Sequence, residues 1–132
     1  MTEEVARRNR RRSPRVPTRI RILFTRAGTS IAIEAETDDI SVDGMFVRTQ
    51  RRAPDPGTRL GLLLKFEEPS QEMMLSGVVA RVREEEETGS ESPPPGMGIR
   101  FVDMDEGTRE ALVRALEGTD AYRTMLEAEE SG

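Results

Sequence analysis

Residues 18–35 read TRIRILFTRAGTSIAIEA and are the strongest indication of the fold class. Apolar residues occupy alternate positions on both sides of a short turn at residues 27–30, and alternation is the period of a half-buried strand. The alternating residues are Ile20, Ile22 and Phe24 before the turn and Ile31, Ile33 and Ala35 after it. We therefore predict a β-hairpin whose apolar side chains are half-buried on one face.

Further short strands follow the hairpin, separated by turns and loops rich in Gly, Pro and acidic residues. The segments predicted to be strands are 45–47, 60–66, 73–83 and 97–102. With no Trp, one Tyr and four Phe, the core must be built from Leu, Ile, Val and Met, including Met73, Met74 and Met97. The pattern predicts a mainly all-β protein, a small antiparallel barrel of six or seven strands.

A helix is predicted to begin at Asp105, whose carboxylate can accept hydrogen bonds from the first-turn amides, and to end at Gly118 in a left-handed conformation. A second short helical pattern follows. The predicted organisation is a flexible Arg-rich arm at 1–17, a barrel with its C-terminal helix at 18–118, and a short helical, frayed acidic tail at 119–132.

The composition excludes several classes of function. The chain has no Cys and no His, so it lacks disulfides, thiolate metal sites, Cys nucleophiles and the usual general base. We therefore predict a protein that is not an enzyme and has no metal site and no cofactor. No apolar run approaches the roughly 18 residues of a membrane span, and no secretory signal is evident, so we expect no membrane partner and a cytoplasmic location.

Charge is distributed unevenly along the chain. Residues 5–33 contain nine Arg and no acidic residue, whereas from residue 34 onward 23 acidic residues outnumber 11 basic ones. This segregation suggests an anionic ligand or an intramolecular clamp. Two segments lack an easy structural explanation: RRSPR at residues 11–15 and DISVDG at residues 39–44.

These two segments resemble the motifs of the PilZ family, whose domains carry RxxxR just before the first barrel strand and [D/N]xSxxG some residues later. The segment GMGIRF at 96–101 and the acidic helix start after it also resemble that family. The resemblance covers roughly residues 8–118. It implies a bacterial β-barrel domain that binds the second messenger cyclic di-GMP.

The motif residues suit that ligand, which carries two phosphates and two guanines. Arg11 and Arg15 could fork onto a phosphate or onto guanine O6 and N7. Asp39 offers the carboxylate that the guanine N1–H and N2–H₂ donors need. Ser41 offers a hydroxyl to a phosphate or base edge, and Gly44 lets the chain turn and the ligand approach. Without a ligand, the same residues are a solvated basic arm and a turn bonded to its own backbone.

Other residues are secondary candidates or departures from the family pattern. Arg81 stands where related domains often place a residue that stacks on guanine, although a surface strand residue is an equal reading. Arg10 adjoins the arginine pair. Ser13 stands where members of the family often have an aromatic or larger residue. Asp43 stands where they frequently have Gly, and it adds a negative charge there.

The sequence thus predicts a cyclic di-GMP receptor or adaptor that changes the conformation of its arm and signals through an effector protein that the sequence does not identify. The alternative within the family is a degenerate PilZ-type module that acts by protein contacts and binds no nucleotide. A nucleic-acid partner is not expected, because the body is acidic and aromatic residues are scarce. The lack of His and Cys argues against a hydrolase.

Overall fold

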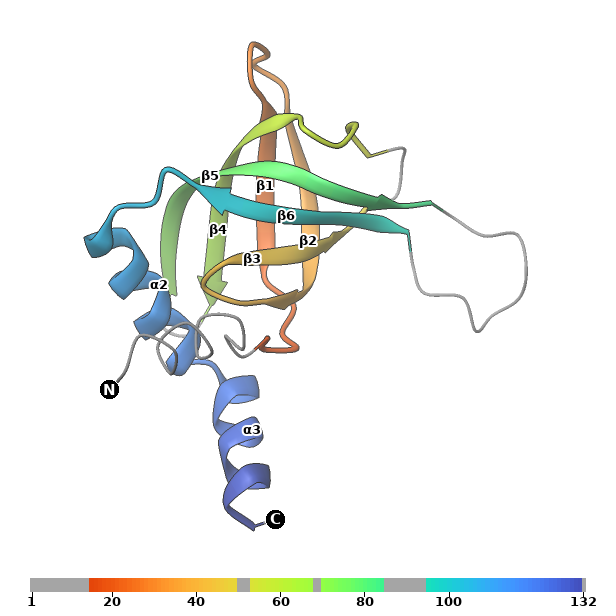
Figure 1. The fold of residues 1–132 in the computed structure, drawn as a ribbon. Coiled ribbons are helices and arrows are strands. Elements are labelled where there is room, and N and C mark those ends of the chain that lie inside the picture. The colour runs from red at the N-terminus through yellow and green to blue at the C-terminus, as the bar shows by residue number, and fades with distance from the viewer. Residues whose placement is uncertain (1–14, 50–52, 68–69, 85–94, 132) are drawn as a thin grey trace, which may run out of the picture.

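The computed structural model describes residues 15–49, 53–67, 70–84 and 95–131. Six antiparallel strands close into a barrel in the order β1-β2-β3-β6-β5-β4 (Figure 1). The strands are β1 (Arg21–Arg26), β2 (Ala32–Ile40), β3 (Gly44–Arg48), β4 (Arg59–Glu67), β5 (Ser70–Arg83) and β6 (Gly96–Val102). Two helices follow, α2 (Glu106–Glu117) and α3 (Asp120–Ser131). The predicted barrel with a C-terminal helix is confirmed, with six strands.

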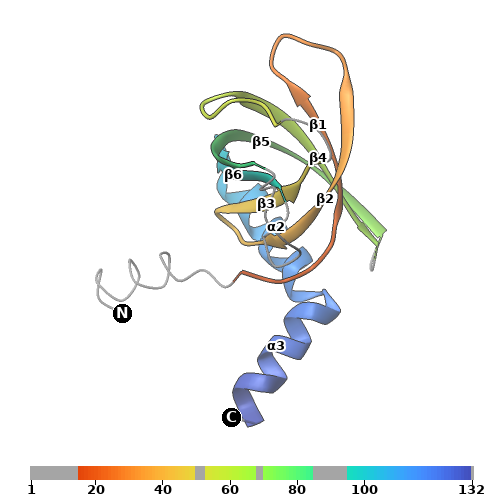
Figure 2. The same cartoon turned by 90° about the vertical axis from the view of Figure 1, so that its right-hand side faces the viewer.

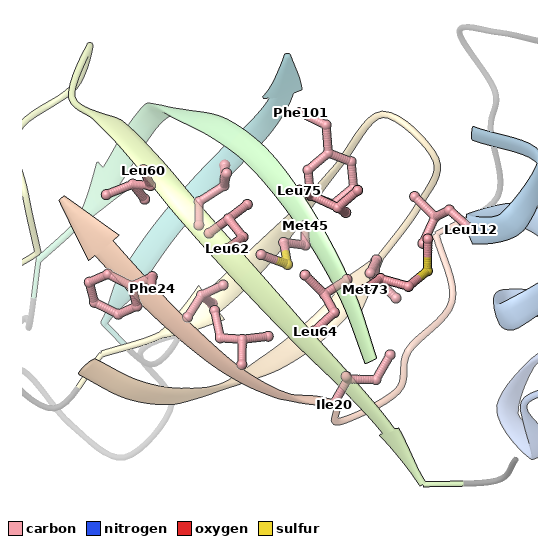
Figure 3. Close-up of a cluster of buried hydrophobic side chains, with 14 of the residues drawn as sticks. Ile20, Phe24, Met45, Leu60, Leu62, Leu64, Met73, Leu75, Phe101 and Leu112 are labelled. Atoms are coloured by element: carbon pink, nitrogen blue, oxygen red, sulfur yellow. The ribbon is translucent and has the colours of Figure 1, made fainter. Parts of the chain in front are cut away.

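The barrel interior holds the hydrophobic core, and strand alternation explains which residues enter it (Figure 3). Along β4, Leu60, Leu62, Leu64 and Phe66 are buried, while the residues between them are exposed or half-buried. On β5 the same alternation buries Met73 and Leu75 and leaves Met74 82% exposed, so the prediction that Met74 fills the core was wrong.

Helix α2 packs against the barrel through Leu112 and Leu116, both buried in the core. At its start the Asp105 carboxylate accepts a 2.7 Å hydrogen bond from the Thr108 amide, and this bond lowers the pKa of Asp105. At its end Gly118 has φ −79° and ψ −7°, so the predicted left-handed conformation was wrong. The chain continues almost directly into α3, and a left-handed residue would turn it away from that direction.

Helix α3 points away from the barrel in both views (Figures 1 and 2). Tyr122 and Met125 are partly buried against the core. The helix extends to Ser131. The fraying that we expect at residues 127–132 stays a prediction. Within the described part of the chain, no helix is both long enough and apolar enough to cross a membrane.

The β1–β2 hairpin projects beyond the rest of the barrel (Figures 1 and 2). Ile31 is 72% exposed and Ile33 46% exposed, so the alternation that predicts a strand with one buried face does not bury these two residues. The pairing of β2 with β3 starts only at Glu36, although β2 pairs with β1 from Ala32 onward. Among the described residues, β4 pairs with β1 up to Arg26, but no strand pairs with β2 at positions 32–35 on the other side of the hairpin.

The segment that precedes β1 belongs to the barrel. Val16 is 1% exposed and forms two backbone hydrogen bonds with Ile40, of 2.8 and 3.1 Å. The buried Thr37 hydroxyl accepts a hydrogen bond from the Ile20 amide and donates one to the Thr18 carbonyl. We had placed Val16 in the arm. Its isolated apolar side chain shows no period, so its burial depends on the bridge to β2, which the sequence does not reveal.

Candidate ligand-binding surface

Arg15 and Asp39 form an ion pair at the end of β2. The Arg15 Nη1 atom lies 2.5 Å from Asp39 Oδ1, although the two residues are 24 positions apart in the chain. The bridge between their neighbours, Val16 and Ile40, brings them together. The side chains are 51% and 33% exposed, so the pair contributes only about 0–1 kcal/mol to folding. This contribution to the stability of the fold is too small to explain why both charged residues occur at this place.

Ser41 is 3% exposed and its hydroxyl is bonded within the turn that follows β2. Its Oγ accepts a hydrogen bond from the Asp43 amide at 3.1 Å and donates a long one of 3.4 Å to the Gly44 carbonyl. These contacts match the alternative interpretation, in which the polar side chains of the DxSxxG motif form hydrogen bonds with the backbone of their own turn. A contact between this hydroxyl and a ligand stays a prediction.

Gly44 is required by the close approach of two strands. A Cβ at this position would lie 2.2 Å from the carbonyl oxygen of Ile99, which belongs to the β6 backbone. Gly44 pairs with Arg100 in that strand. Both partners of the contact are backbone in a closed barrel, so neither can move aside cheaply. The glycine of the motif is thus explained by packing between β3 and β6.

Asp39 and Arg81 lie in one row across the barrel exterior. Asp39 pairs with Phe46 on β3, Phe46 with Gly98 on β6, and Gly98 with Arg81 on β5. Residues directly opposite each other in neighbouring strands share a face. A bulge at Ala80 gives β5 one extra residue and leaves Arg81 exposed on that face. The structure therefore brings Arg15, Asp39 and Arg81 to one surface.

Between Asp39 and Arg81, this row contains Phe46, whose contact with Arg83 was not predicted from the sequence. The Arg83 guanidinium lies over the Phe46 ring, 4.5 Å from its centroid. A Cβ at Gly96 would lie 2.7 Å from that ring, and a Cβ at Gly98 would lie 3.0 Å from the Arg81 side chain. Two glycines at alternate positions of one strand were the available signal, because they leave the first half of one face of β6 without side chains.

Asp43 has a counter-charge in helix α2. Its Oδ1 atom lies 3.5 Å from Arg109 Nη1, and the two side chains are 51% and 39% exposed. The negative charge that we noted beside the predicted phosphate-binding turn is therefore offset within the chain. The Asp43 carbonyl also accepts a 2.9 Å hydrogen bond from the Phe101 amide. These contacts connect the turn to both α2 and β6.

The other predicted residues, Arg10, Arg11 and Ser13, lie outside the described residues. Two surface hollows of the described residues are lined by other parts of the barrel, and neither includes Arg15, Asp39 or Arg81. In the same part of the chain, no group of three acidic side chains is placed to hold a metal ion. The candidate site is thus an open, charged surface.

A six-stranded antiparallel barrel with an arginine bridged to the end of its second strand, followed by a DxSxxG turn, defines a narrow structural class. The family model described as the PilZ domain matches residues 9–118, and the chain belongs to the PilZ family. Comparison with curated proteins found no match.

Solved structures of PilZ proteins share the fold. The PilZ domain of YcgR from Escherichia coli, solved with c-di-GMP, matches with a TM-score of 0.69 and 15% identity over 93% of this chain and 99% of that one. The Bacillus subtilis inhibitor of motility MotI/DgrA gives 0.67 and 19% over 89% of this chain. The chain spans about half, 52%, of that protein. The PilZ domain of CeSA from a cellulose-synthesizing bacterium gives 0.56 and 19%, over 80% and 97%.

Proposed function

We propose that this PilZ domain is a cyclic di-GMP receptor that acts as an adaptor. PilZ domains are regulatory receptors, and the similar YcgR domain was solved with this nucleotide. The observation that carries the proposal is the placement of Arg15 beside Asp39, in the row that ends at Arg81. An anion-binding group, a guanine-binding carboxylate and a stacking group then share one open surface.

Ligand binding would replace the ion pair with stronger contacts. Arg15 would turn to a phosphate or to guanine O6 and N7, while Asp39 would accept from the guanine N1–H and N2–H₂ groups. Giving up an exposed ion pair costs about 0–1 kcal/mol, whereas each new charge-assisted hydrogen bond contributes about 1.5–3 kcal/mol. The balance favours the ligand. The guanidinium group of Arg81 would stack on the flat face of a guanine base.

The arginine pair is anchored close to this surface. Val16 is fixed in the core immediately after Arg15. Arg11 stands four positions earlier, so the fully extended chain keeps its Cα within about 14 Å of the Cα of Arg15. Arg10 adjoins it. Arg10 and Arg11 can therefore reach the ligand that Arg15 contacts. We propose that ligand binding orders residues 1–14 against the barrel, where an effector protein recognises them.

We expect cyclic di-GMP to protect the arm from proteolysis. Bonds after Arg11 and Arg12 should be cut by trypsin at least several-fold more slowly with saturating ligand, because an arm clamped on the barrel does not fit a protease site. Mass spectrometry of the timed digest measures this, and cleavage after Arg26, an exposed residue at the start of the turn between β1 and β2, is the internal control. Equal protection at both places would contradict a specific effect on the arm.

Binding itself is tested by calorimetric titration. Cyclic di-GMP should bind about 5- to 150-fold more tightly than cyclic di-AMP, because adenine lacks the N–H donors that guanine presents to Asp39 and the unmet contact costs about 1–3 kcal/mol at the one base that this carboxylate contacts. GTP and cyclic GMP should also bind weakly. Equal affinity for the adenine analogue would contradict the assigned role of Asp39.

The second candidate is a PilZ-type interaction module that binds no nucleotide. The specific observation in its favour is that the motif groups already have partners within the chain: Arg15 is bonded to Asp39 and Ser41 to its own turn. The absence of heat on titration at protein concentrations of tens of micromolar, a roughly suitable range for micromolar affinities, would favour this candidate.

A further inference from the structure

The turn between β2 and β3 is linked to helix α2 by the side chain of Arg109. Arg109 Nη1 lies 3.5 Å from Asp43 Oδ1, and the two side chains are 39% and 51% exposed. Figure 1 shows α2 beside the end of the barrel at which β2 turns into β3. An exposed ion pair contributes little to folding, so the stability of the fold does not account for this contact.

Asp43 places a carboxylate within the motif that is proposed to bind the ligand. Its amide donates to Ser41 Oγ at 3.1 Å, and its carbonyl accepts from the Phe101 amide at 2.9 Å, so the residue is held in the turn. Asp43 stands three positions before Phe46, the strand partner of Asp39, and three residues of strand span about 10 Å. The Debye length is also about 10 Å at about 0.1 M salt, so a phosphate bound near Asp39 lies within the field of this carboxylate.

We propose that Arg109 raises the affinity for the anionic ligand by cancelling the charge of Asp43. This role rests on the proposed function, because it concerns the same ligand and the same motif. Two opposite unit charges in contact act on a more distant anion as a nearly neutral group. Without the guanidinium, the carboxylate would repel both phosphates of cyclic di-GMP. Arg109 thus acts on the ligand through Asp43 and not by contact.

The direction of its side chain distinguishes Arg109 from Arg114, the other arginine of α2. Arg114 Nη2 lies 3.9 Å from Glu110 Oε2 of the same helix, and its side chain is 81% exposed. A pair four positions apart along one helix stabilises that helix. Arg109 instead reaches across to the turn of the barrel that carries the ligand motif. The two arginines therefore have the same charge and the same helix but different partners.

The test is the cyclic di-GMP affinity of single and double variants of the full chain, measured by calorimetric titration at about 20 mM salt. Arg109→Ala should weaken binding about 2- to 10-fold, because it leaves the Asp43 charge uncancelled. Asp43→Asn should tighten binding by a similar factor, and the double variant should bind like the unmodified chain. If the pair only held the turn in shape, both single variants would break it and both would weaken binding. At about 0.5 M salt both effects should shrink toward zero, because salt screens the charges.

Arg114→Ala is the matched control, since it removes the same charge from the same helix. It should leave the affinity within about 2-fold of that of the unmodified chain, because its charge is farther into solvent and paired elsewhere. Circular dichroism should show all variants folded, since each changed side chain is 39% or more exposed.

Three results would overturn the role of Arg109 while the unmodified chain binds cyclic di-GMP. Asp43→Asn could weaken binding, Arg109→Ala could bind as tightly as Arg114→Ala, or the loss in Arg109→Ala could persist in the double variant. The last result would mean that Arg109 contacts the ligand itself. An unmodified chain that binds no cyclic di-GMP would overturn the proposed function, and the role of Arg109 with it.

Discussion

Arg15→Ala should lower the affinity for cyclic di-GMP by about 30-fold or more. Loss of one partner in a desolvated charged contact costs about 2–5 kcal/mol, which corresponds to roughly 30- to 5000-fold in the dissociation constant. The side chain is half exposed in the free protein, so its loss should leave the free energy of unfolding within about 1 kcal/mol of its starting value. Calorimetric titration and urea denaturation of the same sample measure both quantities.

Arg59→Ala is the matched control for this variant. Arg59 Nη2 lies 2.5 Å from Asp103 Oδ2, and the two side chains are 58% and 69% exposed. It is therefore another short, exposed Arg–Asp pair, placed on β4 and away from the row that contains Asp39. If Arg15→Ala binds as tightly as Arg59→Ala, the arginine motif does not hold the ligand, and the module without nucleotide gains support.

Gly44→Ala should destabilise the barrel by about 3 kcal/mol or more, or prevent folding. The new methyl group would lie 2.2 Å from the Ile99 carbonyl oxygen, so β3 and β6 would have to separate along their pairing. Overpacking usually costs about 1–3 kcal/mol, and a clash between two backbones lies at or above the upper end. Urea denaturation with a circular dichroism signal gives the free energy of unfolding.

Gly61→Ala shows whether the effect is specific. Gly61 lies within β4, and the nearest atom to a Cβ there is the Thr25 carbonyl oxygen at 4.0 Å. This variant should fold with nearly unchanged stability, since Ala fits and reduces the entropy of the unfolded chain. If Gly44→Ala is as stable as Gly61→Ala but fails to bind cyclic di-GMP, the glycine serves the ligand and not the strand pairing.

Strands with a regular period were predictable from the sequence, and the limits of β2 were not. In β4 four inward apolar residues alternate with outward ones, so the period alone defines the strand. The residues at the hairpin tip have the same period, yet Ile31 and Ile33 are exposed. Alternation shows which side chains share a face, but burial depends on a neighbouring strand, and β3 ends before it reaches them.

The candidate site was predictable as a set of residues but not as an arrangement. The family motifs supplied Arg15, Asp39 and Arg81, whereas their proximity depends on a bridge and on pairings between strands far apart in the chain. The stack of Arg83 on Phe46 was missed for the same reason, because these residues meet only through pairing with β6. The role of Gly44 in strand packing could be seen only once its neighbour was known.

The extra residue in β5 has a consequence for comparing this sequence with its relatives. Ala80 and Arg81 together face Gly98, and both are exposed, while Val79 before them is buried. Deleting Ala80 would restore regular pairing and keep Arg81 outside and Val82 on the inner side. A relative without the extra residue therefore aligns correctly only if a one-position gap is placed at Ala80. An ungapped alignment counted from the start of β5 would match Arg81 to an inward position, and its counterpart would be overlooked.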